Sequence, residues 1–294
     1  MQASIMATDP TIAILSGKGG TGKTLLSVNL SSVAAMATYI DCDVEEPNGN
    51  LFFKPSREFE KLVTVKKPVV DETLCDGCHK CVDFCAFNAL ALIGKRLMIF
   101  DEICHSCGGC IYVCPQKALS ESERPIGEMS IGHSGSVRCI SGTMNIGESS
   151  GVPIIEALLK HKDGNLTIID APPGSSCLVT ESIRLADFCI LVAEPTIFGS
   201  HNLAMVHQLV TLLGKKHAVV LNKTLEGVNP SEEYCKKNNI PILGNIPFDK
   251  RLGKMNSEGR IAAREDAHYH KLFSAILEKA LKEVSDETAA DPQR

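Results

Sequence analysis

The sequence carries the stretch Gly17-Lys18-Gly19-Gly20-Thr21-Gly22-Lys23-Thr24 near its start. This stretch matches the pattern G-x-x-x-x-G-K-[ST], in which a glycine-rich turn presents backbone N–H groups to phosphates. A short apolar run from Thr11 to Leu15 precedes it, and an apolar helical pattern from Leu25 to Ala34 follows. A strand, a glycine-rich loop and a helix in this order predict a nucleotide phosphate site at the start of a helix.

Two side chains of this loop have expected roles in phosphate chemistry. Lys23 is placed to reach the β- and γ-phosphates, and Thr24 to supply an oxygen ligand to Mg²⁺. A glycine-rich turn without a ligand is the alternative, but the motif and its context agree. The residues predicted to bind the nucleotide here are Gly17, Lys18, Gly19, Gly20, Thr21, Gly22, Lys23 and Thr24.

Short apolar strands alternate with helical stretches through the rest of the chain. Such alternation predicts a mostly parallel, doubly wound α/β sheet with helices on both faces. Ligands of these sheets lie at the carboxyl ends of the strands. The predicted strands end at Asp41, Asp170, Glu194, Asn222 and Pro247.

The pattern breaks between residues 65 and 121, where a cysteine run is duplicated. Eight of the 13 cysteines lie between Cys75 and Cys114, as two C-x2-C-x2-C-x3-C runs that start 29 residues apart. This is the spacing of bacterial ferredoxins with two [4Fe–4S] clusters, in which the fourth cysteine of each run ligates the other cluster. The predicted sets are Cys75, Cys78, Cys81 and Cys114 for one cluster, and Cys104, Cys107, Cys110 and Cys85 for the other.

Zinc is the chemical alternative for these cysteines, because Cys₄ zinc sites also use C-x2-C pairs. The third cysteine of each run and the duplication favour iron–sulfur clusters. In the second run a proline, Pro115, follows the fourth cysteine, whereas in the first run Ala86 stands at that position. This difference removes no ligand. The predicted organisation is a nucleotide-binding domain in two parts, residues 1–64 and 122–294, around a small α+β ferredoxin-type insert at residues 65–121.

Lys18 is a second lysine that an ordinary phosphate loop does not need. With it, the loop resembles the deviant Walker A loop, K-G-G-T-G-K-T, of the class that contains MinD, ParA, Mrp and the nitrogenase iron protein. The resemblance implies a P-loop ATPase that works as a homodimer, with ATP and Mg²⁺ bound and Lys18 reaching the phosphates of the partner. A lysine exposed to solvent is the alternative for Lys18.

Two carboxylates extend this resemblance. The segment from Asp41 to Asn48 resembles switch I of the class, which implies that Asp43 orients the attacking water. The segment from Asp170 to Gly174 resembles Walker B and switch II, which implies that Asp170, with Thr24, holds the Mg²⁺ shell. A turn or helix-cap aspartate is the alternative for Asp43.

Two further segments, Asn222-Lys223 and Ile246-Pro247-Phe248-Asp249, resemble the adenine-facing segments of the class. They imply that Asn222, Pro247 and Asp249 bind the nucleotide. An asparagine can offer both a donor and an acceptor to a purine edge, but it can also cap a strand end.

Cys177 follows Asp170 by seven residues. In the nitrogenase iron protein a cysteine at this offset ligates a cluster that bridges the dimer, so the resemblance offers the same role for Cys177. Cys139 is nearby in sequence, but its surroundings do not align with the second cysteine of that arrangement. A free packing cysteine is the alternative.

Composition narrows the functions further. The formal net charge of −5 argues against nucleic acid as a partner, and no apolar run approaches the 18 residues of a membrane span. No basic stretch precedes an apolar one at the N-terminus, so we expect a cytoplasmic protein.

The motifs together resemble MinD-superfamily ATPases that carry an inserted ferredoxin domain. This implies a homodimer that couples ATP hydrolysis to electron transfer, or to cluster handling, with a redox or cluster-accepting protein. The alternatives are a spatial organiser like MinD or ParA, and an electron carrier with a vestigial nucleotide site.

Overall fold

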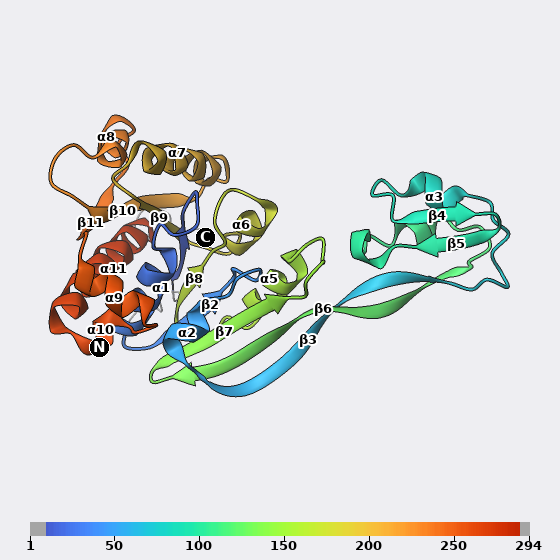
Figure 1. Cartoon of the computed structure of the whole chain (residues 1–294), viewed down its shortest axis with the longest axis horizontal. Helices are drawn as coiled ribbons and strands as arrows, with labels where there is room; N and C mark the ends of the chain where they lie inside the picture. The colour runs from blue at the N-terminus through green and yellow to red at the C-terminus, as the bar shows by residue number, and fades with distance from the viewer. Residues whose placement is uncertain (1–9, 289–294) are drawn as a thin grey trace.

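The computed structural model describes residues 10–288, and a nine-stranded sheet forms the centre of this part (Figure 1). Its strand order is β11-β10-β9-β1-β8-β2-β7-β6-β3, and the neighbours from β11 to β7 pair in parallel. This confirms the predicted mostly parallel α/β sheet. The parallel strands are β1 (Thr11–Leu15), β2 (Ala37–Asp41), β7 (Val137–Met144), β8 (Leu166–Asp170), β9 (Phe188–Ala193), β10 (Lys216–Thr224) and β11 (Ile242–Pro247).

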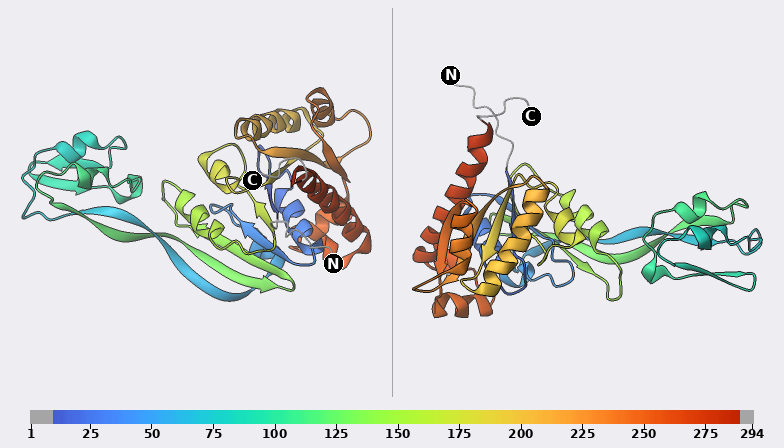
Figure 2. Two further views of the ribbon diagram at one scale, coloured as in Figure 1. Left: turned by 180° about the vertical axis from the view of Figure 1, so that it is seen from behind. Right: turned by 90° about the horizontal axis from the view of Figure 1, so that it is seen from above.

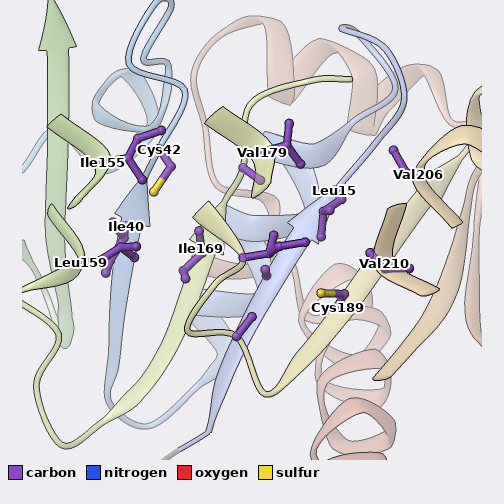
Figure 3. Packing of buried hydrophobic residues seen from close by; sticks show 14 of the residues in the cluster. Leu15, Ile40, Cys42, Ile155, Leu159, Ile169, Val179, Cys189, Val206 and Val210 are labelled. Carbon is purple, nitrogen blue, oxygen red and sulfur yellow. The ribbon is translucent and has the colours of Figure 1, made fainter. Parts of the chain in front are cut away.

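Helices cover both faces of the parallel strands. Alternate residues of β1 belong to different core layers. Ile12 and Ile14 belong to the first layer, which includes residues of α1, α9 and α11, and Leu15 belongs to the second layer, which includes residues of α5, α6 and α7. Figure 3 shows the second layer, with Leu15 close to Val179 of α6 and Val206 of α7. The helices are α1 (Lys23–Val33), α2 (Gly49–Phe53), α5 (Val152–Leu159), α6 (Cys177–Ser182), α7 (Ile197–Leu212), α8 (Pro230–Lys237), α9 (Lys250–Ser257), α10 (Ala262–Glu265) and α11 (Ala267–Thr288).

The amphipathic helix α11 uses its apolar side inside the core. Phe273 is fully buried and Ile276 and Leu277 are nearly so, on the side of the helix that packs against β9 and β11. Burial of such side chains contributes about 1.5–3 kcal/mol each. Among residues 10–288 no helix has the length and hydropathy to cross a membrane. The prediction of a cytoplasmic protein rests on the N-terminal segment, which lies mostly outside the described residues.

Two long strands form a ribbon that leaves the sheet. β3 (Ser56–Val70) and β6 (Leu119–Ser134) pair antiparallel from Ser56 opposite His133 to Val70 opposite Leu119. The ribbon carries the cysteine-rich insert at its far end, outside the main body (Figures 1 and 2). The predicted domain limits, after residues 64 and 121, fall within β3 and β6.

The insert is small and built from two similar halves. Its elements are α3 (Lys80–Phe84), β4 (Leu90–Ile93), β5 (Arg96–Ile99), the 3₁₀ turn η1 (Asp101–Ile103) and α4 (Gly109–Tyr112). Positive φ angles recur at the 29-residue offset of the sequence repeat, so the two cysteine runs follow the same backbone path. These pairs are Gly77 and Ser106, His79 and Gly108, and Asn88 and Lys117.

Candidate nucleotide and cluster sites

The phosphate loop leads from β1 into α1 and depends on a glycine at its last turn. Gly22, the residue before α1, has φ +105°, a conformation that residues with a Cβ rarely adopt. A Cβ at this position would lie 2.1 Å from Nδ2 of Asn222. The backbone path and the close approach of Asn222 therefore both require glycine here.

Asn222 and Lys223, near the end of β10, form hydrogen bonds with the backbone of the phosphate loop. Asn222 is 2% exposed, and its Nδ2 donates to the carbonyl oxygen of Thr21 at 2.8 Å. Its Oδ1 accepts the backbone N–H of Lys223 at 2.9 Å, and Nζ of Lys223 donates to the carbonyl oxygen of Gly20 at 2.9 Å. The structure thus gives Asn222 a role in supporting the loop, which sequence reasoning missed. Its contact with a base stays a prediction.

Lys18 forms an ion pair within its own chain. Its Nζ lies 2.8 Å from Oε2 of Glu194, and Nζ of Lys223 lies 2.6 Å from Oε1 of the same carboxylate. The Glu194 side chain is 12% exposed. Burial opposes its ionisation, but the hydrogen bonds from Lys18 and Lys223 outweigh burial and hold its pKa below the usual value. Glu194 therefore joins two lysines at the phosphate loop.

Three carboxylates gather beside Lys23 at the ends of β2 and β8. Asp41 and Asp170 lie opposite each other in the strand register, and both are 1% exposed. Asp41 accepts backbone N–H groups from Gly49 at 2.8 Å and Asp43 at 3.2 Å. Asp41 had no assigned role in the sequence analysis. The signal that could have revealed it is the pairing of two strands that both end in aspartate.

The electrostatics of this cluster favour a bound cation. Burial, and then the charge of Asp170, raise the pKa of Asp41 to about 8. Burial raises the pKa of Asp43 to about 6 and also raises that of Asp170, while the Lys23 ammonium opposes both shifts. Oδ2 of Asp170 accepts from the Tyr39 hydroxyl at 3.1 Å, but its buried Oδ1 has no hydrogen-bond partner. An unpartnered carboxylate oxygen beside Lys23 fits the predicted Mg²⁺ site.

The predicted cysteine sets surround two separate cavities. The first, of about 370 Å³ including open space, is lined by Cys75, Cys78, Cys81 and Cys114. The second, of about 560 Å³ on the same measure, is lined by Cys85, Cys104, Cys107 and Cys110. Each cavity takes its fourth cysteine from the other run, so the fold brings together the two crossed sets that the spacing predicts. Four thiols around one cavity are the donor set of a [4Fe–4S] cluster.

The fourth cysteines share a second feature. Sγ of Cys85 accepts the backbone N–H of Ala89, and Sγ of Cys114 accepts that of Ala118, both at 3.3 Å. Hydrogen bonds of this kind stabilise a thiolate and tune cluster potentials. Burial raises the pKa of Cys110 to about 11. In the described part of the chain, no three His, Cys, Asp or Glu side chains converge as the ligands of a single metal ion do.

The remaining predicted residues lie apart from the phosphate loop's own contacts. Pro247 is exposed at the end of β11. Oδ1 of Asp249 caps α9 by accepting two backbone N–H groups, and its Oδ2 accepts the Tyr269 hydroxyl at 2.5 Å. Cys177 is exposed at the first turn of α6, whereas Cys139 is 2% exposed inside β7. Nucleotide contacts of Pro247 and Asp249, and cluster ligation by Cys177, stay predictions.

The fold and the loop define a P-loop nucleotide-binding protein. The description "CobQ/CobB/MinD/ParA nucleotide binding domain" matches residues 12–262, and the chain belongs to this family. An uncharacterized protein of Methanocaldococcus jannaschii is 29% identical over 92% of this chain and 96% of its own length. The iron-sulfur cluster carrier protein of Pyrococcus horikoshii is 24% identical over 94% and 86%.

A solved structure resembles nearly the whole chain, whereas a ferredoxin resembles about a fifth of it. The Mg-ADP complex of the septum site-determining protein MinD from Pyrococcus horikoshii aligns with a TM-score of 0.57 over 92% of this chain and 95% of that one, at 19% identity. This likeness shows the fold. A ferredoxin of Pyrobaculum islandicum is 34% identical over 21% of this chain and 59% of its own. With the clustered cysteines, it supports an iron–sulfur domain.

Proposed function

We propose that this protein is an iron–sulfur ATPase. In a homodimer, ATP binding and hydrolysis would drive electron transfer, or the handling of an iron–sulfur cluster, with a partner protein. The observation that carries the proposal is the joining of two complete sites in one chain. A phosphate loop with buried carboxylates lies in the main body, and two cysteine-lined cavities lie in the insert at the far end of the β3–β6 ribbon.

The residues of the nucleotide site have distinct proposed roles. Backbone N–H groups of residues 17–24 bind the phosphates, and Lys23 neutralises charge on the transferred group. Asp43 orients the attacking water, while Thr24 and Asp170 hold Mg²⁺, which would neutralise the developing phosphate charge. The support for these roles is the buried, unpartnered oxygen of Asp170 and the position of Lys23 beside the carboxylates.

The dimer gives Lys18 its proposed role. When two subunits face each other across ATP, Lys18 leaves Glu194 and binds the phosphates of the partner. Asn222, Pro247 and Asp249 are proposed to lie near the base, although Asn222 and Asp249 also have structural partners.

The insert supplies the redox part of the proposal. Two [4Fe–4S] clusters would provide one-electron transfer, held by the crossed cysteine sets around the two cavities. Cys177 is a candidate ligand for a cluster shared between subunits. The proposed partner is a cytoplasmic redox or cluster-accepting protein rather than nucleic acid or a membrane, in line with the net charge of −5.

Two assays on anaerobically purified protein test this function. The expected result is Mg²⁺-dependent ATP turnover together with about eight irons and eight acid-labile sulfides per chain. Lys23→Ala should abolish turnover and leave iron and sulfide unchanged, because the insert folds around its own metal. Turnover that persists in Lys23→Ala, or stoichiometric zinc with negligible sulfide, would overturn the proposal.

A further inference from the structure

Arg124, on β6, bridges the nucleotide-binding part of the chain and the insert. Its guanidinium donates to both carboxylate oxygens of Glu148, at 2.5 and 2.7 Å. Its Nη2 also donates to the backbone carbonyl oxygen of Asp101, at 3.2 Å. The side chains of Arg124 and Glu148 are only 16% and 9% exposed, so this forked ion pair is largely shielded from water and salt.

On the insert side, Arg124 reaches the second cysteine run. The carbonyl oxygen of Asp101 that accepts from Arg124 also accepts the backbone N–H of Cys104, at 3.3 Å. The carboxylate of Asp101 pairs with Lys67 on β3. Both strands of the ribbon therefore hold the turn that leads into Cys104, the first cysteine of the second cavity.

On the nucleotide side, Glu148 belongs to the loop between β7 and α5. This loop is attached at its start, where the N–H of Met144 donates to the carbonyl oxygen of Val44 at 2.8 Å. Val44 is 1% exposed and directly follows Asp43. The loop that carries Glu148 is thus bonded to the segment that resembles switch I, which contains Asp43.

The loop and the ribbon also meet directly. The N–H of Asn145 donates to the carbonyl oxygen of Ile126 on β6 at 2.9 Å, two residues from Arg124. A displacement of Val44 would therefore move the loop against β6 and change the position of Glu148. Because one guanidinium holds both Glu148 and Asp101, that displacement would be passed to the turn before Cys104.

We propose that Arg124 is the positioning residue that couples the nucleotide state of the Asp43 segment to the cluster site of Cys85, Cys104, Cys107 and Cys110. This inference rests on the proposed function, and it names the contact through which the two sites act on each other. A two-stranded ribbon twists readily, so it transmits orientation weakly by itself. The shielded pair Arg124–Glu148 fixes the insert-proximal end of the ribbon to the loop.

The rate of iron removal by a chelator tests the proposal on the full, cluster-loaded chain. Rates are compared with MgATP and without nucleotide, and the ratio measures coupling. Coupling energies of 1–3 kcal/mol correspond to ratios of about 5 to 150. Arg124→Gln should bring the ratio close to one while iron content and basal ATP turnover stay near wild type. Hydrogen–deuterium exchange at residues 101–104 should likewise lose its response to ATP.

Two further variants sharpen the test. Glu148→Gln leaves the bond from Arg124 to Asp101 and removes only the carboxylate charge on the loop, so it too should lower the ratio. Lys66→Gln breaks a neighbouring exposed pair with Glu121 on the same ribbon and should leave the ratio unchanged. If wild type responds to ATP and both Arg124→Gln and Glu148→Gln keep its ratio, Arg124 is not the coupling residue. If wild type shows no response, the proposed function fails as well.

Discussion

Nζ of Lys18 lies 2.8 Å from Oε2 of Glu194 in the same chain. A lysine expected to reach across a dimer is therefore held by a carboxylate of its own subunit. Lys223 binds the other oxygen of that carboxylate at 2.6 Å. Formation of the dimer would have to replace the contact between Lys18 and Glu194 with a stronger one to phosphate.

The ion pair between Lys18 and Glu194 predicts how Glu194→Gln changes dimer formation. Because Lys18 is 43% exposed, its ion pair contributes at most about 1 kcal/mol after solvent screening. The variant should dimerise with MgATP at about a two- to fivefold lower protein concentration, as measured by sedimentation. Glu181→Gln removes a pair with the exposed side chain of Arg184 and serves as the control. Weaker dimerisation of Glu194→Gln would mean that Glu194 supports the dimer instead.

The crossed cysteine sets predict the iron content of two double variants. Cys75→Ser with Cys114→Ser removes two ligands of one cavity, so about four irons should remain. Cys75→Ser with Cys85→Ser removes one ligand from each cavity, and both clusters should be lost or damaged. Iron and sulfide assays distinguish the two variants. If their iron contents are exchanged, each run holds its own cluster.

The conformation of Gly22 predicts a loss of nucleotide binding in Gly22→Ala. The alanine Cβ would collide with Asn222 and would require a positive φ, at a cost above about 1 kcal/mol. Calorimetric titration with MgATP should show affinity reduced by at least tenfold. Gly253→Ala, at an open helical position, should bind normally and gain a little stability. Normal affinity in Gly22→Ala would show that the loop tolerates another path.

The raised pKa of Asp41 predicts how stability changes with pH. Asp41 has a pKa of about 8 in the folded chain and about 4 when unfolded, so the folded state binds more protons between these values. Without Mg²⁺ or nucleotide, the free energy of unfolding should therefore fall as the pH rises from 5 to 8. Asp41→Asn should reduce this fall by about 1–3 kcal/mol in urea unfolding with EDTA present. An equal fall in both proteins would assign the pH dependence to other groups.

Much of the nucleotide-binding fold could be predicted from local patterns. The strands β1, β2, β8 and β9 are short, mainly apolar runs, and β1 is followed by a loop with a specific motif. Strands of a parallel sheet are buried on both faces, so an apolar run in the sequence directly indicates such a strand. Cys42, Cys189 and Cys235 are likewise buried in the core.

The ribbon could not be predicted in the same way. Most residues of β3 are exposed and many are charged, because the ribbon is solvated on both faces for much of its length. A solvated pair of strands lacks the hydrophobic alternation that marks a strand in sequence. Its register comes from pairing between Ser56–Val70 and Leu119–Ser134, which are separated by the whole insert.

The contacts of Glu194, Asn222 and Arg124 were also invisible in sequence. Each joins segments that are far apart in the chain, such as Asn222 and Thr21 or Arg124 and Glu148. Motifs report spacing within one segment, whereas these side chains act between segments. Only the folded backbone brings them within hydrogen-bond distance.

The coupling between the two ends of the molecule is tested most directly in wild-type protein loaded with clusters. Sedimentation mass and the rate of iron chelation are measured with MgATP, with MgADP and without nucleotide. We expect MgATP alone to favour the dimer and to change the chelation rate by about fivefold or more, and Lys18→Ala to lose both effects while still binding nucleotide. The same mass and the same chelation rate in all three nucleotide states would contradict a coupled iron–sulfur ATPase and would favour an electron carrier with a vestigial nucleotide site.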